Sequence, residues 1–105
     1  MKEDLLKIEV IKNEDSKRFE LVVNGFTAFI DYVEDGRIIK LTHTESPKEL
    51  AGKGVATALI EKSLKYIQEN NYELYPLCPL VFAFIKRYPQ WKDVVSKEFP
   101  AYDKL

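Results

Sequence analysis

The sequence predicts an α/β fold with a mixed sheet, in which an antiparallel meander leads through a helical crossover to a parallel strand and short C-terminal helices. Three observations support this prediction. Apolar residues alternate over short stretches early in the chain, an amphipathic helical pattern follows a glycine-containing loop, and a β-rich stretch follows that helix. A chain of 105 residues suits one hydrophobic core, so we expect a single domain over residues 1–105.

Composition narrows the class of protein. A formal net charge of −1 argues against a nucleic-acid binder that works through bulk charge. The single cysteine cannot form an internal disulfide, which favours folding in a reducing compartment. No apolar run is long enough to span a bilayer, and the start Met1-Lys2-Glu3-Asp4 is too polar for a signal peptide. We therefore expect a cytoplasmic protein with neither a nucleic-acid nor a membrane partner, and the oligomeric state stays open.

Four strands are predicted before the glycine-containing loop. Leu6, Ile8 and Val10 alternate in the first of them, and the second places its apolar residues on one face. Asn24-Gly25 is the strongest short signal for a hairpin, and a second turn is expected at residues 34–36. Strands joined by hairpins form an antiparallel meander. The predicted strands cover residues 5–11, 18–23, 26–33 and 37–43.

The helix after the loop has one apolar stripe and one charged face, so we expect it to pack on the sheet. Asn70-Asn71 should end this helix. Residues 72–77 follow as a fifth strand, and a helical crossover makes it parallel to the strand that ends at His43. The stripe consists of Val55, Leu59, Ile60, Ser63, Leu64 and Ile67.

Pro79 suits the first position of another helix, and residues 80–85 are apolar on every side, which predicts a buried helix. This helix should end before Pro89, because proline restricts the residue that precedes it. Residues 90–95 are expected to form a short helix with Trp91 and Val94 directed inward. For the remaining tail the sequence leaves packing open.

The loop before the long helix has the character of an anion site. Gly52 and Gly54 let the backbone approach a ligand closely, because no Cβ stands in the way. A helix start carries unpaired N–H groups and partial positive charge, and Lys53 adds a full charge. The plain alternative is a glycine-rich turn, since this loop lacks the Lys-Ser or Lys-Thr of a Walker loop and the third glycine of a dinucleotide fingerprint.

Gly52-Lys53-Gly54-Val55-Ala56 resembles the coenzyme-A loop of the GNAT acetyltransferases, whose motif is Arg or Gln, two residues, Gly, one residue, then Gly or Ala. Gly54 and Ala56 match this motif, whereas Ala51 takes the Arg or Gln place. Together with His43-Thr44-Glu45, Pro47, Cys78-Pro79 and Tyr88-Pro89, the chain resembles the very short, single-domain GNAT-like N-acetyltransferases over residues 19–95.

The resemblance implies acetyl-CoA-dependent transfer of an acetyl group to an amine, with acetyl-CoA (coenzyme A) as the cofactor. It also implies that Thr42, His43 and Thr44 bind the pantetheine arm through their backbone. The pyrophosphate would be held by Gly52, Lys53, Gly54, Val55, Ala56 and Thr57. Larger members have helices between their first strands that shape the acceptor site, and this chain has only residues 13–17 there. The acceptor pocket should therefore be open or shared with a partner, and the amine, a small molecule or a protein, is not identified.

Two residues, His43 and Cys78, are the catalytic candidates. They end two strands that should be parallel, and ligands gather at the carboxyl ends of such strands, so we expect them to face one site. A thiol next to an imidazole and a helix start is a potential nucleophile. The alternatives are a cysteine that only fills space and a histidine with a structural role. Direct attack by the amine, without a covalent step at Cys78, is equally open.

Two further expectations concern this site. The strand ending at His43 should splay or bulge away from the strand ending at Cys78, because a pantetheine arm needs free backbone groups. GNAT enzymes commonly use a tyrosine hydroxyl in the following helix as general acid, but here Phe84 stands where similar proteins often have Tyr, and Tyr88 where they have His. One His and one Cys cannot form a structural zinc cage, so no metal is expected.

A non-catalytic acyl-CoA-binding module and a plain interaction domain remain the alternative functions. The interaction domain draws support from the departures at Ala51 and Phe84.

Overall fold

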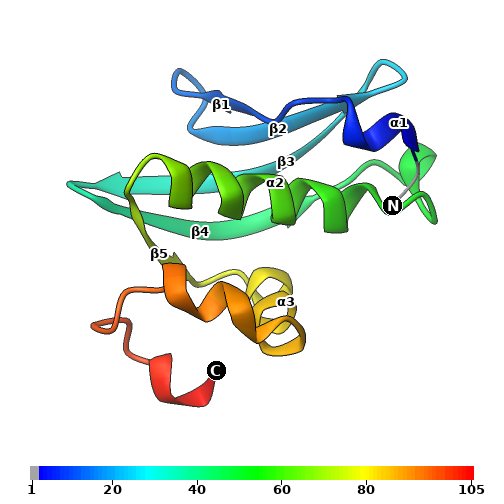
Figure 1. Cartoon of the computed structure of the whole chain (residues 1–105). Helices are drawn as coiled ribbons and strands as arrows, with labels where there is room; N and C mark the ends of the chain where they lie inside the picture. The colour runs from blue at the N-terminus through cyan, green and yellow to red at the C-terminus, as the bar shows by residue number, and fades with distance from the viewer. Residues whose placement is uncertain (1–2) are drawn as a thin grey trace.

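The structure is a computed structural model that describes the backbone of residues 3–105 and the side chains from Leu5 onward (Figure 1). The described strands form one mixed sheet in the order β1-β2-β3-β4-β5, antiparallel from β1 to β4 and parallel between β4 and β5. The elements in chain order are α1 (Glu3–Leu6), β1 (Ile11–Asn13), β2 (Arg18–Val23), β3 (Phe26–Asp35), β4 (Ile38–Glu45), η1 (Lys48–Leu50), α2 (Val55–Glu69), β5 (Glu73–Pro76), α3 (Pro79–Arg87), η2 (Pro89–Val94) and η3 (Tyr102–Lys104).

The predicted meander is confirmed, with small shifts at one turn. Asn24 and Gly25 have φ values of 52° and 81°, the left-handed conformation that a tight two-residue hairpin requires. The β3–β4 turn is made by Gly36 and Arg37 rather than by residues 34–36, so β3 continues to Asp35 and β4 begins at Ile38. Gly36 has a φ of 59°, which places the turn at the residue best able to adopt it.

The prediction of a strand over residues 5–11 is wrong. The structure has the helical turn α1 there, and strand pairing begins only at Ile11. Leu5 is buried and Leu6 is 64 % exposed, whereas the prediction required Leu6 to share a face with Ile8 and Val10. Three alternating residues do not distinguish a strand from a helical turn followed by an extended segment.

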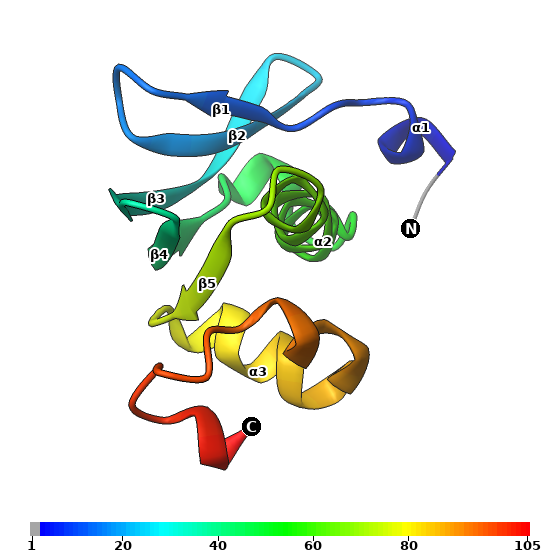
Figure 2. The same cartoon turned by 60° about the vertical axis from the view of Figure 1, so that its left-hand side comes forward.

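One face of the sheet is covered by α2, and the opposite face of β2, β3 and β4 carries no helix within the described part of the chain (Figure 2). All six residues of the predicted apolar stripe of α2 are buried, which confirms how this helix packs. Facing them from the sheet are Phe19, Leu21, Ala28, Ile30, Ile39 and Leu41, each with no exposed surface. We refer to the uncovered side as the open face.

The segment that follows β5 packs next to that strand (Figure 2). The α3 helix begins at Pro79 as predicted, but its burial is one-sided: Val81, Phe84 and Ile85 are buried and Leu80 is 55 % exposed, so the expectation of burial all round is wrong. The short helix expected at residues 90–95 is the 3₁₀ helix η2, which buries Val94 and leaves Trp91 half-buried.

The tail also packs on the fold. Phe99 is buried, and its ring lies 5.4 Å from the ring of Tyr75 on β5. The amide of Ser96 donates a hydrogen bond of 3.0 Å to the carbonyl of Leu74, so this segment covers part of the β5 edge.

Candidate functional site

A β-bulge in β4 decides which side chains face the candidate site. Asp31 pairs with His43 and Tyr32 pairs with Leu41, which leaves Thr42 as an extra residue opposite β3. The Thr42 hydroxyl donates to the carbonyl of Asp31 at 3.2 Å. Strict alternation would have placed His43 on the core face with Leu41. The inserted residue reverses this, so that Thr44 turns into the core and His43 turns out to the open face.

Beyond Leu41, strands β4 and β5 separate. Their paired residues run from Ile38 and Glu73 to Leu41 and Pro76 and stop there. The amide of Cys78 still reaches the carbonyl of Leu41 at 2.7 Å, and residues 42–45 have no β5 partner. The predicted splay is therefore confirmed. It leaves backbone groups of β4 available on one side, and we call this gap the β4–β5 slot.

Cys78 and Thr44 meet at the floor of the slot. Both residues are buried, and their side chains form a hydrogen bond of 3.1 Å between Sγ and Oγ1, in which either atom can donate. Cys78 is also the N-cap residue of α3, which fixes it at the helix start. The sequence indicated Thr44 only as a backbone contact, so this use of its side chain was missed.

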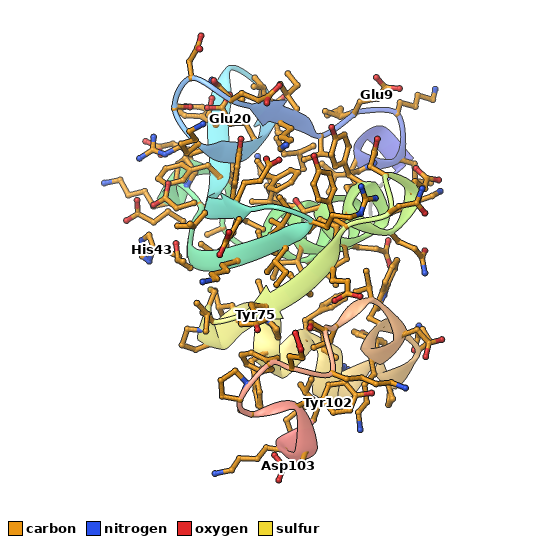
Figure 3. All side chains as sticks on the ribbon, turned by 90° about the vertical axis from the view of Figure 1, so that its left-hand side faces the viewer. Glu9, Glu20, His43, Tyr75, Tyr102 and Asp103 are labelled. Atoms are coloured by element: carbon orange, nitrogen blue, oxygen red, sulfur yellow. The ribbon has the colours of Figure 1, made fainter. Side chains whose placement is uncertain are left out.

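His43 does not contact Cys78. Its imidazole is on the open face and projects away from the sheet (Figure 3), with a side chain that is 58 % exposed. The neighbouring charged group is Glu45, whose Oε1 lies 3.7 Å from Nε2 of His43. The structure thus does not form the expected thiol–imidazole pair, because the bulge places the two groups on opposite faces of the sheet. Whether either residue acts in catalysis stays a prediction.

The glycine loop presents free donors at the start of α2. Gly52 and Gly54 both have a φ of 74°, and a Cβ added at either would meet no atom within 4 Å, so the space in front of the loop is open. Gly54 is the N-cap residue and provides no side-chain cap, and no acidic residue stands in the first turn. The first intrahelical bond runs from the amide of Ala58 to the carbonyl of Gly54. The N–H groups of Val55, Ala56 and Thr57 therefore lack helical partners.

A hollow of about 240 Å³ lies over these donors. It extends from Ser46 and Pro47 at the end of β4, past Gly52 and Gly54, to Thr57 in the first turn of α2. Lys48 also lines it, and Lys53 sits in the same loop between the two glycines. Unpartnered N–H groups, positive charge and open space together suit the phosphates of a nucleotide-like ligand.

A larger hollow, of about 410 Å³, lies between the N-terminal segment and the outer side of α2. It is lined by Glu9, Val10, Lys62, Lys65, Tyr66 and Glu69, with charges of both signs. It includes neither a strand end nor a free helix start. We therefore place the candidate site at the glycine loop and the slot rather than at the larger hollow.

The position expected to supply a general acid has no hydroxyl. Phe84 is buried and packs on Tyr88, with 4.8 Å between the ring centroids. Tyr88 caps the C-terminal end of α3, whereas Cys78 caps its N-terminal end. The nine residues of α3 separate the two along the chain, and the Tyr88 ring lies beside Phe84, so Tyr88 as a substitute general acid stays a prediction.

A partly buried charged cluster lies elsewhere, between β1, β3 and the start of β5. Lys12 has a side chain that is 7 % exposed, and its Nζ lies 2.6 Å from Oε1 of Glu34. The same ammonium lies 5.3 Å from the ring centre of Tyr32 and 5.0 Å from that of Tyr72, whose hydroxyl donates to Glu34 at 3.2 Å. We call Lys12, Tyr32, Glu34 and Tyr72 the Lys12 cluster. Sequence patterns do not predict this cluster, because its members are far apart in the chain.

The charges of the cluster stabilise one another. Burial lowers the pKa of Lys12, but the hydrogen bond to Glu34 and the carboxylate charge outweigh burial and hold that pKa above its ordinary value. The bond from Lys12 holds the pKa of Glu34 below its ordinary value. Burial raises the pKa of Tyr32, whose hydroxyl is buried without a hydrogen-bond partner.

Two further properties bear on the site. In residues 3–105, no helix is both long and apolar enough to cross a membrane. The same residues contain no group of three or more His, Cys, Asp or Glu side chains placed to hold a metal ion.

Comparison with known proteins supplies the family. A family model described as GCN5-related N-acetyl-transferase matches residues 18–94. The chain is similar to protein NATD1 of Gallus gallus and of Mus musculus, at 27 % identity over 86 residues that cover 78 % of this chain and 77 % of each relative. Protein NATD1 of Bos taurus is 28 % identical, with coverages of 78 % and 75 %.

A solved structure shares the fold. The solution NMR structure of a GCN5-like candidate N-acetyltransferase from Staphylococcus aureus superimposes with a TM-score of 0.58 at 26 % identity. The match covers 84 % of this chain and 87 % of that chain. The region that the family model matches, residues 18–94, includes the bulge, the slot and the glycine loop.

Proposed function

The chain belongs to the family of GCN5-related N-acetyltransferases, and from this premise we propose that it transfers an acetyl group from acetyl-CoA to an amine. The observation that carries the proposal is the continuity between two features. The hollow over the glycine loop begins at Ser46, the residue that follows the unpaired end of β4 in the β4–β5 slot. An elongated ligand with a phosphate end and an amide-containing arm fits such a path.

The residues present fit coenzyme A. The N–H groups of Val55, Ala56 and Thr57 would hold its pyrophosphate at the start of α2, with Gly52 and Gly54 giving access and Lys53 adding positive charge. The backbone of Thr42, His43 and Thr44 would hold the pantetheine arm, because β5 leaves it unpaired. When bound, acetyl-CoA supplies an acetyl group activated as a thioester.

Two side chains are proposed to act on the reacting groups. His43, on the open face, accepts a proton from the acceptor amine, and its exposed imidazole is within reach of an amine that approaches from solvent. Cys78 is the candidate nucleophile on the other face. Its burial and its bond to Thr44 require the slot to open before the thiol can react, so we place direct attack by the amine first.

We also propose that residues 1–105 form a single domain and that the protein works in the cytoplasm. The free thiol of Cys78 supports this location, since a reducing compartment keeps thiols unpaired. The acceptor would be an amine on a small molecule or a protein.

A non-catalytic acyl-CoA-binding module is the second candidate. The specific observation in its favour is Phe84, which is buried and offers no hydroxyl to a leaving thiolate. Ala51 also departs from the family loop motif.

Calorimetric titration with acetyl-CoA, paired with an assay for free thiol in the presence of an amine panel, tests the proposal. Binding together with release of CoA supports the transferase. Binding without release from any amine favours the second candidate. No binding at millimolar acetyl-CoA contradicts both.

A further inference from the structure

A third hollow lies on the open face, next to the proposed site. It has a volume of about 200 Å³ and is lined by Thr27, Phe29, Glu45, Ser46 and Pro47. Ser46 and Pro47 also line the hollow over the glycine loop, so the two spaces share a wall. We call it the β3–β4 hollow, since β3 contributes Thr27 and Phe29 and β4 contributes Glu45.

Of the two carboxylates near this hollow, Asp31 is paired with an arginine and Glu45 is not. Arg18 lies 2.8 Å from Asp31 through its Nε and places its guanidinium 3.8 Å from the ring centre of Phe29. The charge of Asp31 is thereby neutralised. Glu45 pairs with Phe29 across the two strands and lines the hollow, and its one ion-pair partner among the described residues is the His43 imidazole at 3.7 Å. Its side chain is 61 % exposed, so an incoming cation can reach it.

This combination has a definite chemical preference. A carboxylate attracts an ammonium group, and an aromatic ring suits both the charge and the methylene groups of an alkylamine. An acceptor that carries its own carboxylate would meet the like charge of Glu45. His43 lies on the same face and pairs with Asp31, whereas Glu45 pairs with Phe29, so the base is close to the carboxylate.

We propose, building on the proposed transferase function, that the β3–β4 hollow binds the acceptor as an alkylammonium ion without a neighbouring carboxylate. Glu45 holds the ammonium, and Phe29 packs against the alkyl chain with the part of its ring that the Arg18 guanidinium leaves uncovered. The His43 imidazole then takes one proton from the ammonium, which leaves a neutral amine with a free electron pair and an imidazolium next to Glu45. The carboxylate stabilises that imidazolium.

An alkylammonium can come from a free diamine or from a lysine side chain, and two probes distinguish these sources. The first is 1,5-diaminopentane, and the second is Nα-acetyl-lysine methylamide, which mimics lysine within a peptide. The matched negative probe is 5-aminopentanoate, which replaces one amino group by a carboxylate-bearing end.

The test is a titration of the ¹⁵N-labelled full chain with each probe, with and without CoA, followed through backbone amide shifts. The expected result is saturable shifts of the backbone amides of residues 27–29 and 43–46 for one or both cationic probes, and none for 5-aminopentanoate. Glu45→Gln should weaken the cationic probe about tenfold, as loss of a charge-assisted contact implies. Glu73→Gln, the same change on β5 at the other end of the sheet, should leave the affinity unchanged.

Turnover provides the second readout. Glu45→Gln should raise the KM of the cationic amine about tenfold with a smaller effect on kcat, and acetyl-CoA affinity should not change. Equal shifts for the zwitterionic 5-aminopentanoate, or equal affinities in parent and Glu45→Gln, overturn the inference while acetyl-CoA binding and CoA release still support the transferase. Failure of acetyl-CoA to bind overturns the transferase, and the amide shifts still decide whether the hollow accepts cations.

Discussion

Two regions of the molecule differ in whether their polar groups have partners within the protein. On the β1 side, the Lys12 cluster pairs its charges within the protein: the ammonium of Lys12 contacts a carboxylate and two aromatic rings, and the Tyr72 hydroxyl completes the carboxylate. On the β5 side, the pairing between β4 and β5 stops at Leu41. The start of α2 has neither a side-chain cap nor an acidic residue in its first turn. The first region pairs its charges within the protein and leaves only the Tyr32 hydroxyl among its described polar groups without a partner, whereas the second leaves several backbone donors free.

The difference separates stability from binding. Buried polar groups that satisfy one another contribute to the folded state, whereas unsatisfied groups next to open space suit a ligand that satisfies them. A change in the Lys12 cluster should therefore alter unfolding and leave binding intact. A change at the glycine loop should weaken the binding of acetyl-CoA, which a change of similar cost in stability elsewhere should not do.

The largest effect is expected from Gly54→Val. A branched side chain at a φ of 74° blocks the approach to the helix start and strains the loop, so acetyl-CoA should bind about 100-fold more weakly or not at all. Calorimetry measures this loss. Gly36→Val is the matched control, because Gly36 has a φ of 59° and equally open space but lies at the other end of β4.

Both glycine variants should lose similar stability, about 1–2 kcal/mol, from the left-handed conformation. Only Gly54→Val should lose acetyl-CoA. A folded Gly54→Val protein that binds acetyl-CoA as the parent does would remove the glycine loop from the proposed site.

The next effect concerns the two faces of β4. His43→Ala should lower kcat about 100-fold, because it removes the proposed base, while alkylation of Cys78 by iodoacetamide keeps its rate. Thr44→Val is the counterpart on the core face and should change the alkylation rate, since Thr44 is the hydrogen-bond partner of the thiol. If His43→Ala changes alkylation and Thr44→Val does not, the side-chain directions set by the bulge are wrong.

Lys12→Met should lower the free energy of unfolding by about 1–2 kcal/mol, because the cation–π contacts and the bond to Glu34 are lost. Glu34 is 33 % exposed and can turn to water, which keeps the loss at the lower end. Urea unfolding gives the value, and Lys65→Met on the exposed side of α2 is the control. The affinity for acetyl-CoA should be that of the parent, and a large loss of affinity would link the two regions.

The smallest effect is a pH dependence. The pKa of Glu34 is lowered in the folded protein by Lys12, so its contribution is present above about pH 4.3, the unfolded value, and is lost as pH falls through the folded pKa. The contribution of Lys12, with a raised pKa, is fully present below its unfolded value of about 10.4. The stability difference between parent and Lys12→Met should therefore shrink on acidification from about pH 6 to about pH 3. Parallel unfolding curves across this range would show that the pair contributes nothing.

Local signals in the sequence were sufficient for most of the fold. Asn24-Gly25 predicts its hairpin because few other residues adopt two successive positive φ values, and Pro79 predicts a helix start because its φ and missing N–H suit that position. The apolar stripe of α2 predicts packing on a sheet through its period alone. Gly52 and Gly54 likewise indicate a loop directly before α2, where the structure has it.

The predictions that were wrong or missing concern contacts between residues that are distant in the chain, which a local sequence pattern does not indicate. A bulge is a one-residue shift between two strands, and Thr42 has no feature that marks it as the extra residue. That shift alone moved His43 to the open face and brought Thr44 to Cys78. Leu80 is exposed because α3 has packing partners on one side only, which its uniformly apolar sequence cannot indicate. The Lys12 cluster likewise joins residues from distant parts of the chain.

The most direct test of the account is an amide-resolved NMR titration of the ¹⁵N-labelled protein with acetyl-CoA. The predicted result is that the large shifts fall at residues 42–45 and 52–57, along the slot and the glycine loop, while the amides of Lys12, Glu34 and Tyr72 stay in place. No shift at saturating acetyl-CoA, or the largest shifts at the Lys12 cluster, would contradict this account, in which one region pairs its charges within the protein and the other region binds the ligand.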